Sequence, residues 1–174
     1  MKEGRKAPAF KLADQDGNIV KLSDFAGRTV VLYFFPKAGT PGCTAQACGV
    51  RDRLADYDAA DAVVVGISRD DPAALREFAE EHDLPFTLLS DPDHKVAEKY
   101  GVWVQKSMYG RAYMGIQRAT FVIGPDGKLL KAFAKVTPEL LQRTAQEYLR
   151  PTNRTVYTIT PAARAASNAS TKSQ

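Results

Sequence analysis

Long apolar runs alternate with amphipathic segments along most of this chain. Residues 30–35 are all apolar, and residues 62–67 contain no polar side chain, a pattern typical of strands buried on both faces. The segment after the second run, residues 72–82, places its apolar residues on one helical face. We predict strands at 29–35, 62–68 and 87–90, and helices at 40–57, 72–82 and 93–100.

Turn sequences mark a hairpin near each end of this alternating region. Asp16-Gly17-Asn18 and Pro125-Asp126-Gly127 each separate two short apolar stretches, as in β-hairpins. Residues 102–119 carry scattered aromatic residues, and we expect one long loop there. A last helix is expected at 137–149. Together these elements predict an α/β fold, with a central mixed β-sheet flanked by helices and an N-terminal hairpin extension.

Composition changes near residue 150. The chain has 174 residues, which suits one domain with a sizeable core. Residues 151–174 are rich in Ala, Ser, Thr and Asn and hold few large apolar side chains. We therefore expect one domain at 1–150 and a poorly ordered tail at 151–174. The tail carries three of the 24 basic residues and no acid, so most of the net charge of +4 lies there and nucleic-acid binding has little support.

The distribution of apolar and cysteine residues predicts a cytoplasmic protein. No apolar run approaches the roughly 18 residues of a membrane span, and no apolar segment follows the charged residues 1–6 as in a secretory signal. The chain has two cysteines, too few for a disulfide-stapled secreted scaffold. We expect no membrane association.

Both cysteines, Cys43 and Cys48, follow the first buried strand. Thr40 is a good N-cap residue and Pro41 suits the first helical position, so Cys43 falls in the first helical turn. A thiol reacts as its thiolate, which the unpaired N–H groups and macrodipole of a helix N-terminus favour. Cys48 lies deeper in the helix without this support. The pair is either a nucleophile with its resolving partner or two ordinary buried cysteines.

Two motifs resemble those of the peroxiredoxin family. Pro36, Thr40 and Cys43 match its Pro-x-x-x-Thr-x-x-Cys active-site pattern, and Cys48 five residues later resembles the bacterioferritin comigratory protein, or Q-type, branch. Residues 109–121 match the second motif of that branch. The similarity covers about residues 4–149, and Gly39 replaces an acidic residue often found at its position.

This resemblance implies a thioredoxin-like fold and an antioxidant enzyme that reduces hydrogen peroxide and organic hydroperoxides. In such a peroxidase the Cys43 thiolate attacks the O–O bond and becomes a sulfenic acid, which condenses with Cys48 to a disulfide. Thioredoxin or a similar dithiol protein would supply the electrons. The resemblance implies no metal, haem or flavin cofactor, and it leaves a monomer and a weak homodimer open.

Four further residues are candidate site residues. The Thr40 hydroxyl can bond both the thiolate and a peroxide oxygen, and Pro36, which lacks an N–H, should pack over the thiolate. Arg118 precedes an apolar run, where a bare charge would be costly, and a cation facing the thiolate would stabilise it and polarise the peroxide. Gln46 lies one helical turn after Cys43 and either positions Arg118 or belongs to a solvated helix face.

Three classes of protein remain as alternatives. The first is a thiol enzyme, although a disulfide oxidoreductase is disfavoured because Cys-x-x-Cys is absent. The second is a redox sensor that signals through a Cys43–Cys48 bridge. The third is a passive binding domain that contains cysteine. Catalytic turnover, a single stoichiometric oxidation and no reaction would distinguish the three.

Overall fold

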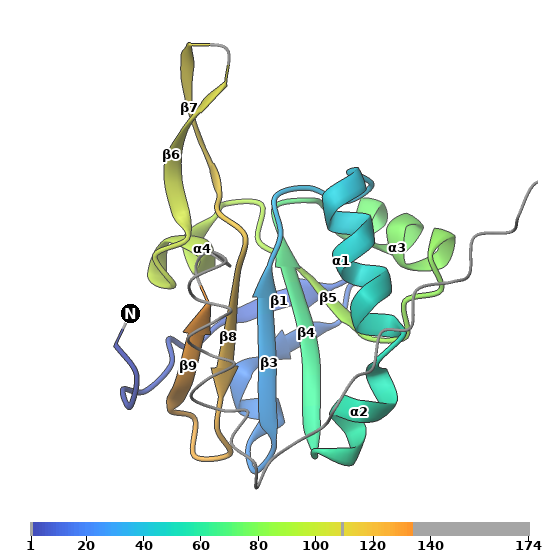
Figure 1. Cartoon of the computed structure of the whole chain (residues 1–174), viewed down its shortest axis with the longest axis vertical. Helices are drawn as coiled ribbons and strands as arrows, with labels where there is room; N and C mark the ends of the chain where they lie inside the picture. The colour runs from blue at the N-terminus through green and yellow to red at the C-terminus, as the bar shows by residue number, and fades with distance from the viewer. Residues whose placement is uncertain (1, 109, 134–174) are drawn as a thin grey trace, which may run out of the picture. The chain divides into compact units, whose positions relative to one another are not determined.

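A seven-stranded mixed sheet lies at the centre of the chain (Figure 1). The computed structural model describes residues 2–108 and 110–133, so the predicted last helix and tail lie outside the described residues. The sheet order is β2-β1-β5-β4-β3-β8-β9. Its strands are β1 Lys11–Asp14, β2 Ile19–Lys21, β3 Thr29–Phe34, β4 Ala62–Ser68, β5 Thr87–Ser90, β8 Ala119–Ile123 and β9 Leu129–Phe133.

The pairing of these strands confirms the predicted mixed sheet. β3, β4 and β5 run parallel, whereas β1, β8 and β9 pair antiparallel with their neighbours. The predicted N-terminal hairpin is formed by β1 and β2, and β1 also joins the main sheet through β5. The described helices are α1 Pro41–Arg51, α2 Leu54–Ala59, α3 Pro72–Glu81 and α4 Lys95–Lys99, with a short 3₁₀ helix at Leu22–Phe25. None of them is long and apolar enough to cross a membrane.

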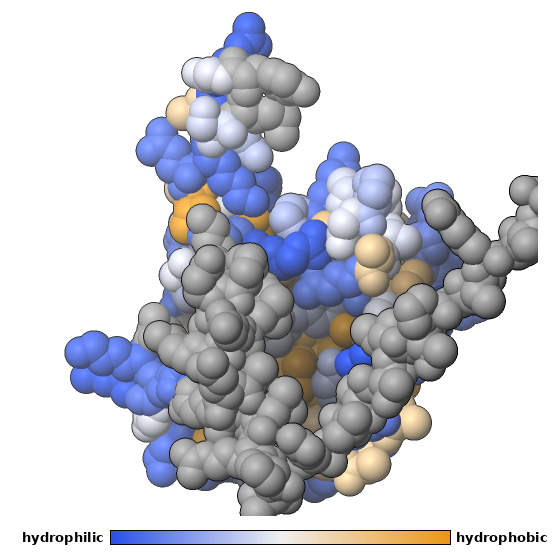
Figure 2. Space-filling model, viewed as in Figure 1, coloured by the Kyte–Doolittle hydropathy of each residue, from blue (hydrophilic) through white to orange (hydrophobic). Residues whose placement is uncertain are grey.

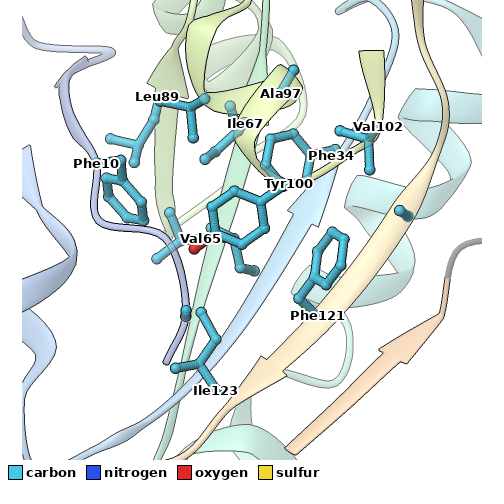
Figure 3. Close-up of a cluster of buried hydrophobic side chains, with 14 of the residues drawn as sticks. Phe10, Phe34, Val65, Ile67, Leu89, Ala97, Tyr100, Val102, Phe121 and Ile123 are labelled. Carbon is cyan, nitrogen blue, oxygen red and sulfur yellow. The ribbon is translucent and has the colours of Figure 1, made fainter. Parts of the chain in front are cut away.

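The central strand β3 buries side chains on both faces of the sheet, which explains its uninterrupted apolar sequence. Leu32 and Phe34 enter one hydrophobic cluster, which includes Tyr100 beside α4 and Phe121 of β8 (Figure 3). The alternate residues Tyr33 and Phe35 enter a second cluster on the other face, which includes side chains of α1 and α3. The sheet is therefore covered on both faces, and α1 is held against one of them.

Residues 102–119 form a hairpin, so the predicted loop is wrong. Strands β6 Trp103–Met108 and β7 Arg111–Ile116 pair antiparallel as a separate two-stranded sheet that projects from the body of the protein (Figure 1). Most of β7 is exposed, and the hairpin surface is largely hydrophilic (Figure 2). With little buried surface on either face, these strands lack the alternation of apolar and polar residues that predicts a strand.

The predicted helix 40–57 is divided into two. α1 ends at Arg51 and α2 begins at Leu54, because the backbone leaves helical geometry at Arg53, with φ −117° and ψ 15°. No proline or glycine marks this break in the sequence. The cysteine-bearing helix is therefore shorter than predicted, and both cysteines lie within its eleven residues.

Candidate active site

Cys43 lies in the first turn of α1, at the position expected from the sequence. Thr40 is the N-cap residue, with extended backbone angles, and Pro41 opens the helix. The Thr40 carbonyl accepts the N–H groups of Cys43 and Thr44, each at 2.9 Å. The Cys43 side chain is buried, with 2% of the residue exposed. Its sulfur is thus held beside the positive end of the α1 macrodipole.

Arg118, in the segment between β7 and β8, brings a positive charge to this cysteine. Its Nη2 donates a hydrogen bond to Cys43 Sγ at 3.1 Å, and its Nη1 donates to Gln46 Oε1. The guanidinium also passes close to the backbone of Gly42, where a Cβ would lie 3.4 Å from Arg118 Nη2, an ordinary contact distance. The guanidinium thus places a positive charge directly against the sulfur of Cys43. Gln46 therefore lies against Arg118 rather than on a solvated helix face.

The remaining candidates are Thr40, Pro36 and Cys48, and among the described residues none of these three makes a hydrogen bond to the Cys43 sulfur. Thr40 Oγ1 donates to the carbonyl of Lys37 at 3.0 Å and makes no side-chain cap to the helix, so the hydroxyl orders the loop instead. Pro36 follows β3 and is exposed. Cys48 is half-buried in α1, and both cysteines are free thiols. The structure thus brings Arg118 and Gln46 to Cys43 and keeps Cys48 apart on an intact helix.

Two residues near this cluster have no sequence signal for a site. Burial raises the pKa of Tyr33, with Cys43 adding to the rise and Arg118 opposing it. Burial lowers the pKa of Lys106 in β6, and Arg118 lowers it further while Cys43 opposes. Both side chains therefore lie within electrostatic reach of the Cys43–Arg118 pair. Sequence reasoning missed Tyr33 because it belongs to a buried strand, and Lys106 because its strand was predicted as a loop.

The Tyr33 ring lies against Gly66 of β4 and belongs to the same buried cluster as Cys43 and Ala47 of α1. A Cβ at Gly66 would lie 2.8 Å from Tyr33 Cζ, so the glycine makes room for this ring. The ring also stacks on Phe35, and the Tyr33 hydroxyl has no hydrogen-bond partner among the residues that the structure describes. Within the described ranges no group of three His, Cys, Asp or Glu side chains is arranged to hold a metal ion.

Several known proteins are similar to this chain over most of its length. The AhpC/TSA family pattern matches residues 4–132. A putative peroxiredoxin bcp of Haemophilus influenzae is 49% identical over 147 residues, covering 84% of this chain and 95% of the relative. Peroxiredoxin Bcp of Escherichia coli K12 is 53% identical over 133 residues, covering 76% of this chain and 85% of the relative.

Solved structures show the same relationship. Peroxidoxin BcpB from Mycobacterium tuberculosis is 36% identical with a TM-score of 0.70, over 84% of this chain and 95% of that one. A peroxiredoxin Q of Xanthomonas campestris is 32% identical with a TM-score of 0.71, over 80% of this chain and 89% of that one. The chain therefore belongs to the AhpC/TSA family, in its Bcp or Q-type peroxiredoxin branch, and is a thiol peroxidase with a thioredoxin-like fold.

Proposed function

We propose that Cys43 is the cysteine that attacks hydroperoxides. The observation that carries this assignment is the 3.1 Å hydrogen bond from Arg118 to Cys43 Sγ in the first turn of α1. The thiolate gives an electron pair to one peroxide oxygen, the O–O bond breaks, and Cys43 becomes a sulfenic acid. The other oxygen leaves as hydroxide or alkoxide and takes up a proton. The guanidinium supports the negative charge that passes from sulfur to oxygen.

Thr40 and Pro36 contribute the surroundings of that sulfur. The Thr40 hydroxyl donates to the Lys37 carbonyl, so its lone pairs remain available to accept the proton of a hydroperoxide. Pro36 offers no backbone N–H to solvent or substrate. Gln46 Oε1 accepts a hydrogen bond from Arg118 Nη1, and this bond directs the other nitrogen of the guanidinium at Cys43.

Cys48 completes the cycle as the resolving residue. Its thiol condenses with the Cys43 sulfenic acid, releases water and leaves a Cys43–Cys48 disulfide. Thioredoxin or a similar dithiol protein then reduces this disulfide by thiol–disulfide exchange. A cytoplasmic location, where thiols are kept reduced, suits such a cycle.

We also propose the organisation of the whole protein. Residues 1–150 form the catalytic domain and residues 151–174 form a tail. The protein acts as a monomer or weak homodimer, without nucleic-acid or membrane partners.

A coupled assay tests this function. Reduced protein is mixed with thioredoxin, thioredoxin reductase, NADPH and either hydrogen peroxide or an organic hydroperoxide. Many equivalents of NADPH should be consumed for each equivalent of protein, and glutaredoxin with glutathione serves as the comparison reductant. Consumption of one equivalent only would indicate a sensor and would contradict the proposed catalytic cycle.

Loss of the guanidinium should slow the attack on peroxide. Arg118→Ala is expected to lower the second-order rate of Cys43 oxidation about 10²- to 10³-fold, the usual effect of removing one charge-stabilising donor. Arg118→Lys should recover only part of the rate, since an ammonium cannot bond Cys43 and Gln46 through one planar fork. Stopped-flow oxidation of the reduced protein measures both effects.

The control for this prediction is Arg28→Ala, which removes a cation paired with Asp61 at the surface. That variant should retain the wild-type rate. An Arg118→Ala protein that reacts as fast as wild type would remove Arg118 from the proposed site.

A further inference from the structure

A polar cluster lies where strands β4 and β5 end, directly behind the loop that leads to Cys43. Ser68 and Ser90 are the last residues of these parallel strands, and both are buried. Asp70, two residues beyond Ser68, sits between them. Its N–H donates to Ser68 Oγ at 3.1 Å, and its carbonyl accepts the Ser90 hydroxyl at 2.8 Å. The Asp70 backbone is therefore fixed to two strands of the sheet.

The Asp70 carboxylate faces the catalytic loop. Its Oδ2 accepts the Ser68 hydroxyl at 2.8 Å and the backbone N–H of Ala38, also at 2.8 Å. Ala38 lies in the turn between β3 and α1. The helix that follows Asp70 does not need this carboxylate, because Asp71 Oδ1 caps α3 by accepting the N–H of Ala74 at 2.9 Å. The side chain of Asp70 therefore bonds the loop before α1 and does not cap its own helix, α3.

Hydrogen bonds continue from Ala38 to the reacting cysteine. Next to Ala38, the Lys37 carbonyl accepts the Thr40 hydroxyl, and the Thr40 carbonyl accepts the N–H of Cys43. Gly39 lies between Ala38 and Thr40 and has φ +70°. Because glycine restricts the backbone less than any other residue, the shape of this turn depends on hydrogen bonds made by its neighbours. A charged acceptor makes hydrogen bonds roughly twice as strong as neutral ones. The carboxylate of Asp70 is therefore well suited to hold Ala38, next to this glycine.

We propose that Asp70 is a positioning residue for peroxide reduction. By holding Ala38 it fixes the turn of residues 36–40, and so the placement of Pro36 and Thr40 around the Cys43 sulfur. It touches neither substrate nor sulfur. This inference rests on the proposed role of Cys43. Attack on a peroxide needs the whole loop correctly placed around the sulfur. Loss of the hydrogen bond from Ala38 to Asp70 should therefore slow this reaction more than it slows reactions that need only the Cys43 sulfur.

Two reactions of the same cysteine separate positioning from general damage. Reduced Asp70→Ala protein should react with hydrogen peroxide about ten- to a hundredfold more slowly than wild type, the range expected when a reacting group is misplaced by about 1 Å. Its alkylation by iodoacetamide should keep the wild-type rate, since alkylation needs the thiolate but not the peroxide-binding loop. Asp70→Asn should restore most of the peroxide rate, because its amide oxygen can accept both donors.

Asp71→Ala is the matched control, because it removes the neighbouring carboxylate and the α3 cap but leaves the hydrogen bond from Ala38 to Asp70. It should lower the melting temperature without changing the peroxide rate. If Asp70→Ala does not fold, Asp70→Ser replaces it, since a hydroxyl one bond shorter does not reach Ala38. A wild-type peroxide rate, an equal loss in alkylation, or the same loss in Asp71→Ala would overturn the proposal. Failure of Cys43 as the reacting residue would appear separately, as turnover by Cys43→Ser.

Discussion

Replacing Cys43 by serine is expected to reduce hydroperoxide turnover to the background rate. A serine hydroxyl is a far weaker nucleophile than a cysteine sulfur, and it cannot form the sulfenic acid that the proposed cycle needs, so the contact with Arg118 would have no reacting sulfur to act on. The loss of a covalent nucleophile can cost about 10⁶ in kcat, which would place the variant below detection in the coupled assay. The assay with thioredoxin, its reductase and NADPH measures this loss directly.

Cys48→Ser is the matched variant, and it should separate attack from resolution. Its Cys43 keeps the contact with Arg118, so one equivalent of peroxide should oxidise it at nearly the wild-type rate. The sulfenic acid then has no internal thiol partner, and a dimedone adduct on Cys43 should be seen by mass spectrometry. Near-wild-type turnover by Cys43→Ser, or a dimedone adduct that requires Cys48, would reverse the proposed roles of the two cysteines.

Local sequence signals predicted the parts of the site that depend on neighbouring residues. Thr40 and Pro41 indicate a helix start, and this alone places Cys43 in the first turn of α1. The unbroken apolar run before it identifies β3 as a strand buried on both faces. Arg118 could be predicted only from the second motif, because it lies 75 positions from Cys43 in the sequence and no periodic pattern links the two residues.

The features that the sequence did not reveal depend on tertiary contacts. Asp70 and Asp71 are adjacent acidic residues before a helix, and only the structure shows that one caps α3 while the other holds Ala38. Lys106 could not be placed near Arg118 because its strand pairs with β7, which is mostly exposed and shows no apolar alternation. These two strands are stabilised by pairing with each other, and such pairing leaves no apolar alternation to detect.

The helix that carries both cysteines must open when the disulfide forms. Cys43 and Cys48 lie on one helix, α1, and five residues of α-helix rise about 7.5 Å while turning the side chains about 140° apart. A disulfide needs Cα atoms within about 6.8 Å and converging Cβ atoms. The proposed bridge therefore cannot form across an intact α1. Opening exposes few large apolar groups, because Cys43 and Ala47 are the only fully buried residues of α1 and Val50 is partly buried.

Amide hydrogen exchange should show this opening. In the reduced protein the amides of α1 should be protected, and in the disulfide form those of residues 43–52 should exchange much faster. Helix α3 packs on the same face of the sheet and carries no cysteine, so its protection should be the same in both forms. Equal protection of α1 in the two forms would rule out the Cys43–Cys48 pairing.

Gly49 offers a way to change the cost of opening without touching the site. It lies within α1 one residue after Cys48 and is exposed, and a Cβ there would meet no atom of the described residues within 4 Å. Gly49→Ala should therefore stabilise the helix by about 0.5–1 kcal/mol. That stabilisation must be overcome before Cys48 can reach the sulfenic acid, so disulfide formation should slow by up to about fivefold while the peroxide step keeps its rate. An unchanged rate of disulfide formation in a variant with a measurably more stable α1 would mean that the helix does not open before the bridge forms.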